Sequence, residues 1–198
     1  MKRIALCASV ASLMVLSGCL GNREKPAVEA PYEVPIDTTV TVLHDTVLIG
    51  HLGEETGMSA LQVITEDSDT FSVSKTAING VEGLMLGEVR DYDDKVMVVV
   101  KMDKDEQYHL TSFLNISQLE RAWKAQDHQL TLKADSTVET TGMNYQSWRI
   151  ERCKLLLIGD SKTEYGTTQT VDTVSIEYLD EDSLQINSLR HGKVKFGH

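Results

Sequence analysis

The chain has 198 residues, 41% of them hydrophobic and 25% charged, as in ordinary globular proteins rather than disordered or collagen-like chains. Its 19 Lys and Arg against 30 Asp and Glu give a net charge of −11. Such a chain repels phosphate backbones, so nucleic acid is not an expected partner. The length allows one domain or two small ones.

The first residues have the pattern of a secretory signal. Lys2 and Arg3 precede a run of 13 apolar or small residues at 4–16. A membrane-spanning helix needs about 20 residues. We therefore expect residues 1–18 to be a signal peptide and 4–16 its hydrophobic region.

This run ends in Leu16, Ser17, Gly18 and Cys19, which resembles the lipobox of bacterial lipoproteins. The resemblance implies that the Cys19 thiol takes up diacylglycerol and that Cys19 becomes the new N-terminus after cleavage. The small residues before it would let the extended chain fit a peptidase groove. The alternative is an ordinary signal peptide with a chance cysteine.

The lipobox implies a membrane anchor, and the residues after Cys19 bear on its location. Leu20 stands where an Asp would retain an enteric lipoprotein in the inner membrane. Surface-exported lipoproteins of Bacteroidetes carry acidic residues at this point, whereas only Glu24 is acidic here. We expect the outer membrane, with the periplasmic side favoured over the cell surface.

Residues 19–37 read as a lipidated, flexible tether. All three prolines of the chain, Pro26, Pro31 and Pro35, lie in this segment. Proline favours extended backbone and does not continue a helix. The eighteen residues after Cys19, at polyproline spacing, would reach roughly 55 Å from the lipid surface.

Residues 38–116 have β-strand patterns throughout. Strand-like runs occur at 40–43, 46–49, 61–64, 71–74, 96–102 and 108–114, and polar clusters rich in Asp separate several of them. Several short strands in so few residues predict a small barrel-like domain, OB-like or SH3-like.

Ser117 and Glu120 have the spacing of a helix capping box. Leu119, Ala122 and Trp123 follow at helical spacing. We therefore expect a helix beginning at Ser117, at the boundary between two β domains.

We expect residues 117–198 to form a second β domain. Alternating apolar and polar residues at 174–178 and 184–187 indicate strands with one buried face. Turns are expected at 151–154 and 179–182. Seven or eight short strands fit an up-and-down barrel. The predicted fold class is thus all-β, with two small antiparallel barrel or meander domains after the signal peptide and the proline-containing tether.

The C-terminal domain also resembles the lipocalin-like domains of Bacteroidetes lipoproteins. The matching positions are Trp123, Trp148, Leu155, Leu157, Gly159, Ser161, Asp172, Thr173, Ile176, Leu179, Ser183, Leu184 and Ile186. Two positions depart from that pattern: Lys124–Asp127 replaces an expected Trp-Val-x-Pro, and Cys153 occupies a turn where Gly or Asp is usual. The resemblance implies fold and location and assigns no activity.

Trp123 and Trp148 are the candidate pocket or core residues. In a lipocalin-like barrel an inward-facing Trp either lines a ligand cavity or fills the core. A barrel of this size is expected to be filled by side chains. We therefore expect Trp148 to be buried, with a partner for its indole N–H.

Candidate catalytic and metal sites are lacking in the sequence. It contains no G-x-S-x-G, Walker A, G-x-G-x-x-G, H-E-x-x-H or C-x-x-C motif. The acidic clusters do not fit a calcium loop, since position six is Val96 in a loop starting at Asp91. These clusters read as hairpin turns. We expect no catalytic residue, no metal ligand and no cofactor.

These features predict a membrane-anchored envelope lipoprotein that acts as a non-catalytic binding module for a protein or a small apolar ligand. A structural or assembly partner in an envelope complex is the alternative, and a hydrolase is the least favoured. An apolar cavity would favour the first hypothesis. A filled barrel with an exposed apolar patch would favour the second.

Overall fold

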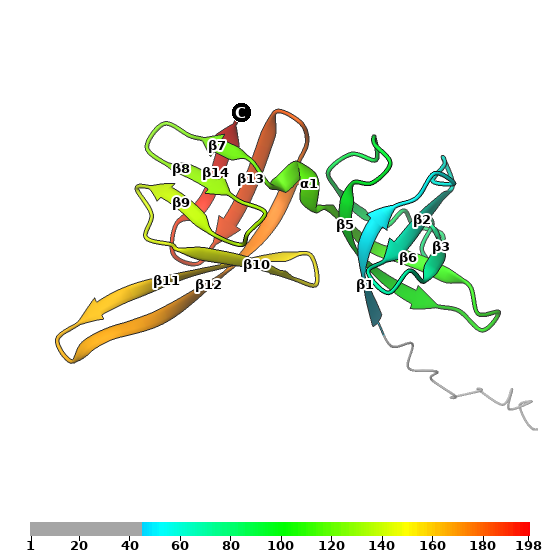
Figure 1. The fold of residues 1–198 in the computed structure, drawn as a ribbon, viewed down its shortest axis with the longest axis horizontal. Helices are drawn as coiled ribbons and strands as arrows, with labels where there is room; N and C mark the ends of the chain where they lie inside the picture. The colour runs from blue at the N-terminus through cyan, green and yellow to red at the C-terminus, as the bar shows by residue number, and fades with distance from the viewer. Residues whose placement is uncertain (1–44) are drawn as a thin grey trace, which may run out of the picture. The chain divides into compact units, whose positions relative to one another are not determined.

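The computed structural model describes residues 45–198. The signal peptide, the lipobox with Cys19, the tether and the strand expected at 40–43 lie outside the described residues. The described part consists of fourteen strands and one short helix, α1 (Figure 1). The all-β prediction is confirmed.

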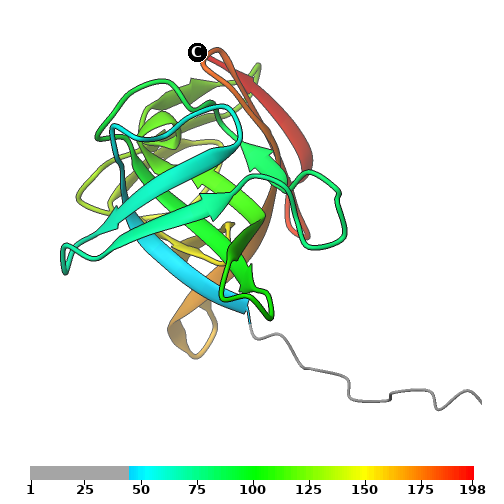
Figure 2. The same ribbon diagram turned by 90° about the vertical axis from the view of Figure 1, so that its right-hand side faces the viewer.

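The first sheet contains six strands. They are β1 (Asp45–Leu52), β2 (Ala60–Thr65), β3 (Thr70–Ser74), β4 (Leu84–Leu86), β5 (Lys95–Met102) and β6 (Tyr108–Asn115). Their order is β3-β2-β1-β5-β6-β4, and β3 also pairs with β6. Five strands thus form a closed ring, β1-β2-β3-β6-β5. Figure 2 shows these strands, coloured blue to green, around a common centre.

Two pairings in this sheet are parallel, although an antiparallel domain was predicted. β3 pairs with β6 at Val73–Tyr108, and β4 pairs with β6 at Leu84–Ser112. The parallel β3–β6 pair closes the ring of an otherwise antiparallel sheet. β5 is a nearly continuous apolar strand, and five successive residues from Val96 are buried. The ring encloses an apolar cluster that includes Leu61, Val98 and Phe113.

The second sheet contains eight strands. They are β7 (Ala122–Lys124), β8 (Gln129–Leu132), β9 (Val138–Thr141), β10 (Ser147–Glu151), β11 (Lys154–Thr163), β12 (Gly166–Leu179), β13 (Ser183–Ser188) and β14 (Gly192–Gly197). Strands adjacent in sequence are adjacent in the sheet, and β14 pairs back to β7 at Gly197–Lys124. A single bridge between Thr137 and Ser147 joins β9 to β10. The sheet is therefore an up-and-down barrel, as predicted.

The predicted hairpins of this barrel are confirmed. Arg152 and Cys153, with φ of 48° and 58°, form the two-residue turn between β10 and β11. Positive φ at both central residues is the geometry whose twist matches the flanking strands. In β12, Val174 and Ile176 are buried while their neighbours are exposed, because alternate side chains face opposite sides of a strand.

The helix expected at Ser117 is wrong in its start and its extent. α1 spans only Ile116–Leu119, and its N-cap is Asn115, whose side chain accepts a hydrogen bond from the N–H of Gln118. The Ser117 hydroxyl instead accepts the Lys95 N–H at 2.9 Å. Trp123 belongs to β7 and pairs with Leu130. Strand pairing therefore ends the helix before the apolar residues that had suggested its continuation.

The two sheets are not joined by strand pairing, but they share one apolar core, and the Gly87 N–H donates to the Leu179 carbonyl at 3.0 Å. No strand of 45–115 pairs with a strand of 122–198. One cluster nevertheless contains Met97 and Leu114 of the first sheet together with Leu155 and Leu179 of the second. The described residues, 45–198, belong to one compact unit.

Candidate functional site

Trp123 and Trp148 lie in the core of the C-terminal barrel. Trp123 is fully buried, and its indole N–H donates to the Leu119 carbonyl at 3.0 Å. Trp148 is 5% exposed, and its indole N–H donates to the Lys133 carbonyl at 2.9 Å. Each indole N–H thus has an acceptor, so neither tryptophan leaves a buried donor without a hydrogen bond. The burial and the hydrogen bond expected for Trp148 are confirmed.

Large apolar side chains occupy the interior of this barrel. They are Trp123, Leu130, Leu132, Trp148, Leu155, Leu157, Val174, Ile176, Leu184, Ile186 and Phe196, all buried in one cluster. Small barrels are commonly filled in this way. The two tryptophans therefore serve packing, and the interior is not arranged as a ligand pocket.

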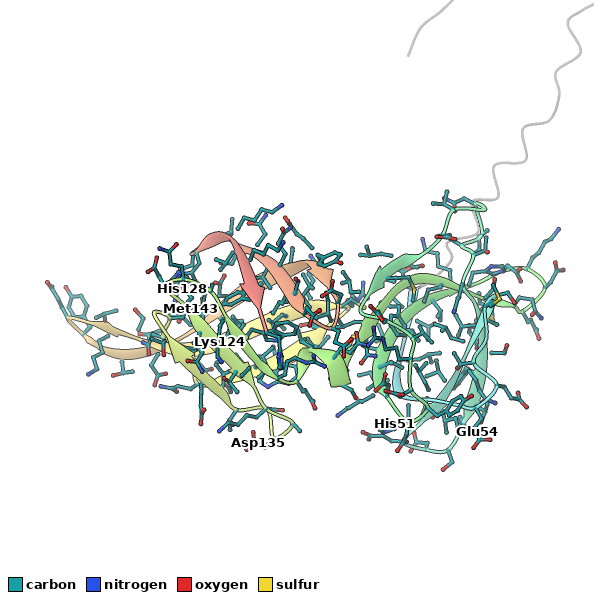
Figure 3. The ribbon with its side chains drawn as sticks, turned by 90° about the horizontal axis from the view of Figure 1, so that it is seen from above. His51, Glu54, Lys124, His128, Asp135 and Met143 are labelled. Atoms are coloured by element: carbon teal, nitrogen blue, oxygen red, sulfur yellow. The ribbon has the colours of Figure 1, made fainter. Side chains whose placement is uncertain are left out.

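Polar groups gather at one end of the barrel. The Tyr145 hydroxyl donates to Asp172 Oδ2 at 2.7 Å, and both side chains are buried. The His191 ring lies edge-to-face against Tyr145 at 5.8 Å and against His128 at 6.0 Å. Figure 3 shows His128 and Met143 together at this end, where β8 and β9 pair through Gln129 and Thr141.

This polar cluster is not a catalytic arrangement. Burial raises the pKa of Tyr145 and lowers the pKa of His191, so the phenol is protonated and the imidazole is neutral at pH 7. His128 Nδ1 and His191 Nε2 are buried without a hydrogen-bond partner. Within residues 45–198, neither the His128 ring nor the His191 ring is hydrogen-bonded to a Ser, Thr or Cys side chain. Within the same range no group of three or more His, Cys, Asp or Glu side chains could hold a metal ion.

Cys153 is a buried thiol rather than a nucleophile. It is 6% exposed, and burial raises its pKa. Its sulfur accepts the Ser112 hydroxyl at 3.5 Å, and its N–H contacts the Met97 sulfur at 3.3 Å. Because thiolates carry cysteine reactivity, a buried thiol with a raised pKa is inert.

The acidic clusters form turns, as the sequence predicted. Asp103 Oδ1 accepts the N–H groups of Asp105 and Gln107, each at 2.9 Å. Asp180 Oδ1 accepts the N–H groups of Asp182 and Ser183. These carboxylates cap their own turns, which is the usual role of Asp in such positions.

A surface hollow of about 440 Å³ lies on the first sheet, beside the loop that connects β3 to β4. Its lining residues are Ala77, Ile78, Asn79, Val81, Glu82, Gly83, Lys101, His109, Leu110 and Thr111. Leu110 is buried and forms the floor, whereas Ile78 and Val81 are 44% and 61% exposed. We call this feature the β3–β4 hollow.

The loop beside the hollow has a defined backbone. Thr76 and Glu82 form an isolated antiparallel bridge, and Ala77 N donates to Val81 O at 2.8 Å. A side chain at Gly83 would place its Cβ 2.8 Å from a Leu110 side-chain carbon and 2.9 Å from the Leu110 carbonyl oxygen. Only glycine therefore allows the loop to lie this close to β6.

His109 fastens this loop to the sheet. Its Nδ1 lies 2.9 Å from the Thr76 carbonyl oxygen and its Nε2 lies 2.8 Å from Asp103 Oδ2. Both partners are acceptors, and an imidazole donates from both nitrogens only when protonated. Accordingly, the Thr76 carbonyl and the Asp103 carboxylate raise the pKa of His109. We call this group the His109 clamp.

The sequence reasoning missed both the hollow and the clamp. Asp103 and His109 stand six apart with a turn between them, so neither the helical nor the strand period applies to the pair. The predicted hairpin could have indicated the contact between Asp103 and His109, because the turn at Asp103–Gln107 brings the flanking strands side by side. The apolar residues Ile78 and Val81 lie in a loop, where a periodicity search gives no signal.

None of the helices in residues 45–198 is long and apolar enough to cross a membrane. Leu16, Ser17, Gly18 and Cys19 are outside the described residues, so the expected lipidation remains a prediction.

Comparison with known proteins places the C-terminal barrel in a fold class. Residues 129–197 match the family model described as lipocalin-like. A solved structure of a lipocalin-like protein from Bacteroides thetaiotaomicron is 23% identical, covers 40% of this chain and 94% of its own, and has a TM-score of 0.33. No curated protein matches the chain. The family match over residues 129–197 makes the C-terminal barrel lipocalin-like, in agreement with the resemblance seen in the sequence.

Proposed function

We propose that this chain is a lipid-anchored, non-catalytic binding module of the bacterial outer membrane, facing the periplasm, whose ligand is a small apolar molecule. The lipocalin-like fold suggests binding rather than catalysis. The barrel interior is filled, so the proposed binding site is the β3–β4 hollow. The observation that carries this proposal is the pair of exposed apolar side chains, Ile78 and Val81, beside a buried apolar floor at Leu110.

The hollow has the composition of a ligand site. Apolar side chains line its floor and loop side, and the polar groups Glu82, Lys101 and His109 lie among its lining residues. Sites for small molecules combine an apolar lining with a few polar groups that orient the ligand. Asp45 Oδ1 lies 3.6 Å from Lys101 Nζ, so this cation keeps a partner when no ligand is bound.

The experiment measures binding of the apolar fluorescent dye 1-anilinonaphthalene-8-sulfonate to the full chain carrying Cys19→Ala, followed by extraction and mass analysis of any co-purified lipid. Val81→Glu places a carboxylate at the hollow and is expected to weaken dye binding at least about tenfold, because burying an unpaired charge is costly. Leu189→Glu is the matched control, since Leu189 is fully exposed in the turn between β13 and β14 and is not among the residues that line the hollow. Equal weakening by both variants would refute the assignment of the hollow.

An assembly role in an envelope complex is the second candidate. Leu84 and Met85 of the edge strand β4 are 55% and 39% exposed and extend the apolar surface beyond the hollow. Crosslinking in intact envelopes distinguishes the two functions. A partner protein that is captured by the wild-type chain and lost with Val81→Glu, together with absence of any bound small molecule, would favour assembly.

A further inference from the structure

The β11–β12 hairpin extends beyond the strands that flank it. β10 pairs with β11 only as far as Ile158, and β13 pairs with β12 only from Ser175. Residues 159–173 therefore form a two-stranded arm without a neighbouring strand, visible in yellow and orange in Figure 1. Most of its side chains are exposed, including Tyr165 at the tip, at 98%.

The backbone of β12 presents unpaired groups along this arm. Glu151 and Lys154 flank a two-residue turn, so the even-numbered residues of β11 bond to β10. The Ile158 carbonyl accepts the Gln146 N–H at 2.8 Å, in agreement with this alternation. The odd-numbered residues of β11 thus bond to the even-numbered residues of β12.

The outward N–H and C=O groups of β12 consequently belong to Thr167, Gln169, Val171 and Thr173. All four residues are exposed, and no backbone hydrogen bond of the described residues reaches them from this side. Exposed strand edges are usually protected by Lys, Pro or a bulge. Residues 167–171 contain no Lys and no Pro, and the β11–β12 pairing is regular along the arm.

We propose that the free edge of β12, residues 167–171, pairs with the same edge of a second copy of this chain. The two edges run antiparallel about a twofold axis at Gln169, and the two arms form one four-stranded sheet. Thr167 of each copy then lies opposite Val171 of the other, both side chains on the same face. This partner goes beyond the proposed ligand-binding function, because the arm contributes no residue to the β3–β4 hollow.

The charge distribution favours a second copy as the partner. The whole chain carries a net charge of −11, which opposes self-association over most of its surface. Residues 165–171, Tyr-Gly-Thr-Thr-Gln-Thr-Val, carry no charge. This edge can meet its own copy without like-charge repulsion.

The other edge of the arm is protected, which limits the assembly to a dimer. On β11, Lys162 is charged and exposed. The Asp160 carbonyl accepts the Asn144 side chain at 2.7 Å, and its carboxylate accepts the Gln146 side chain at 3.0 Å. A twofold contact between identical edges is closed and does not propagate into a fibre.

Disulfide trapping tests the register. Gln169→Cys in the full chain, purified from membranes in detergent, is expected to form a disulfide-linked dimer under mild oxidation, because paired Cα atoms in an antiparallel sheet lie about 5.5 Å apart. Tyr165→Cys is the control. It is at least as exposed but lies opposite Thr173, so its two copies are roughly 27 Å apart. Equal crosslinking of the two variants, or none with Gln169→Cys, would overturn the proposal.

A charge substitution tests the same contact without a cysteine. Gln169→Lys places two like charges directly opposite each other and is expected to weaken dimerisation about fivefold in sedimentation velocity. Thr168→Lys adds the same charge to the neighbouring residue, which has Thr170 rather than its own copy opposite, and should change the dimer constant by less than about twofold. A monomeric wild-type chain at all concentrations, or equal effects of the two substitutions, would refute the pairing.

Discussion

Replacing Trp148 by Ala removes a buried side chain of the C-terminal barrel, on the strand next to the single bridge that joins β9 to β10. The ring is 5% exposed and belongs to the main apolar cluster. Large-to-small replacement of a core Trp or Phe costs about 3–5 kcal/mol of unfolding free energy. For a chain of this size, that loss lowers the melting temperature by about 6–20 °C.

The hydrogen bond contributes the smaller share of this loss. The Lys133 carbonyl accepts both the Trp148 indole N–H at 2.9 Å and the Ser136 N–H at 3.0 Å. It therefore keeps one donor when the indole is removed. Losing the second bond costs about 0.5–1.5 kcal/mol. Trp148→Phe keeps most of the packing. Its free energy of unfolding should therefore fall by only about 1–2 kcal/mol, from the lost hydrogen bond and a small packing defect.

Urea unfolding followed by far-ultraviolet circular dichroism measures both variants without relying on tryptophan fluorescence. The order of stability should be wild type, then Trp148→Phe, then Trp148→Ala. A loss below about 1 kcal/mol for Trp148→Ala would show that the ring is not a packing residue. An equal loss for both variants would assign the effect to the indole N–H. Bound lipid that disappears with Trp148→Ala at unchanged stability would place a ligand site in the barrel.

Three further predictions follow from other parts of the chain. Cys19→Ala should abolish membrane attachment, and detergent-phase partitioning identical to wild type would contradict the lipobox. The Thr76 carbonyl and Asp103 raise the pKa of His109, so the His109 clamp should stabilise the fold fully below about pH 6.5 and lose this contribution as the pH rises through the folded-state pKa. His109→Gln should therefore make the urea midpoint depend less on pH between pH 6 and 9. A pH dependence equal to that of the wild type would exclude the clamp. Cys153 in the folded chain should react with iodoacetamide at least about a hundredfold more slowly than in the chain unfolded by urea, because burial raises the pKa of its thiol. Comparable rates in the two states would show that the thiol is accessible in the folded chain.

The sequence predicted the strand content because strands leave local signals. Alternation at Val174, Ile176 and Tyr178 marks a strand with one buried face, and β12 has that pattern. Asp103 and Asp180 indicated turns because their carboxylates bond to backbone N–H groups within four residues. The resemblance to lipocalin-like domains was also visible in the sequence, and residues 129–197 match that family model.

Local signals failed where longer-range contacts competed with them. Ser117 and Glu120 have capping-box spacing, yet Asn115 caps a helix of only one turn. The Ser117 hydroxyl bonds to the N–H of Lys95, 22 residues away. Ala122 and Trp123, which would have extended the helix, instead pair with Thr131 and Leu130 of β8. Tertiary contacts thus override a helix propensity worth only fractions of a kcal/mol per residue.

What the sequence by itself determined is the all-β class, the hairpin turns and the packing role of Trp148. Only the tertiary structure decided how the first sheet closes, where the apolar hollow lies and which edge of the arm remains open. The parallel β3–β6 pair, the His109–Thr76 contact and the free edge at Gln169 all depend on neighbours distant in sequence or on their absence. Because a strand pattern specifies which face is buried but not which strand lies alongside, these features could not be read from the residues in order.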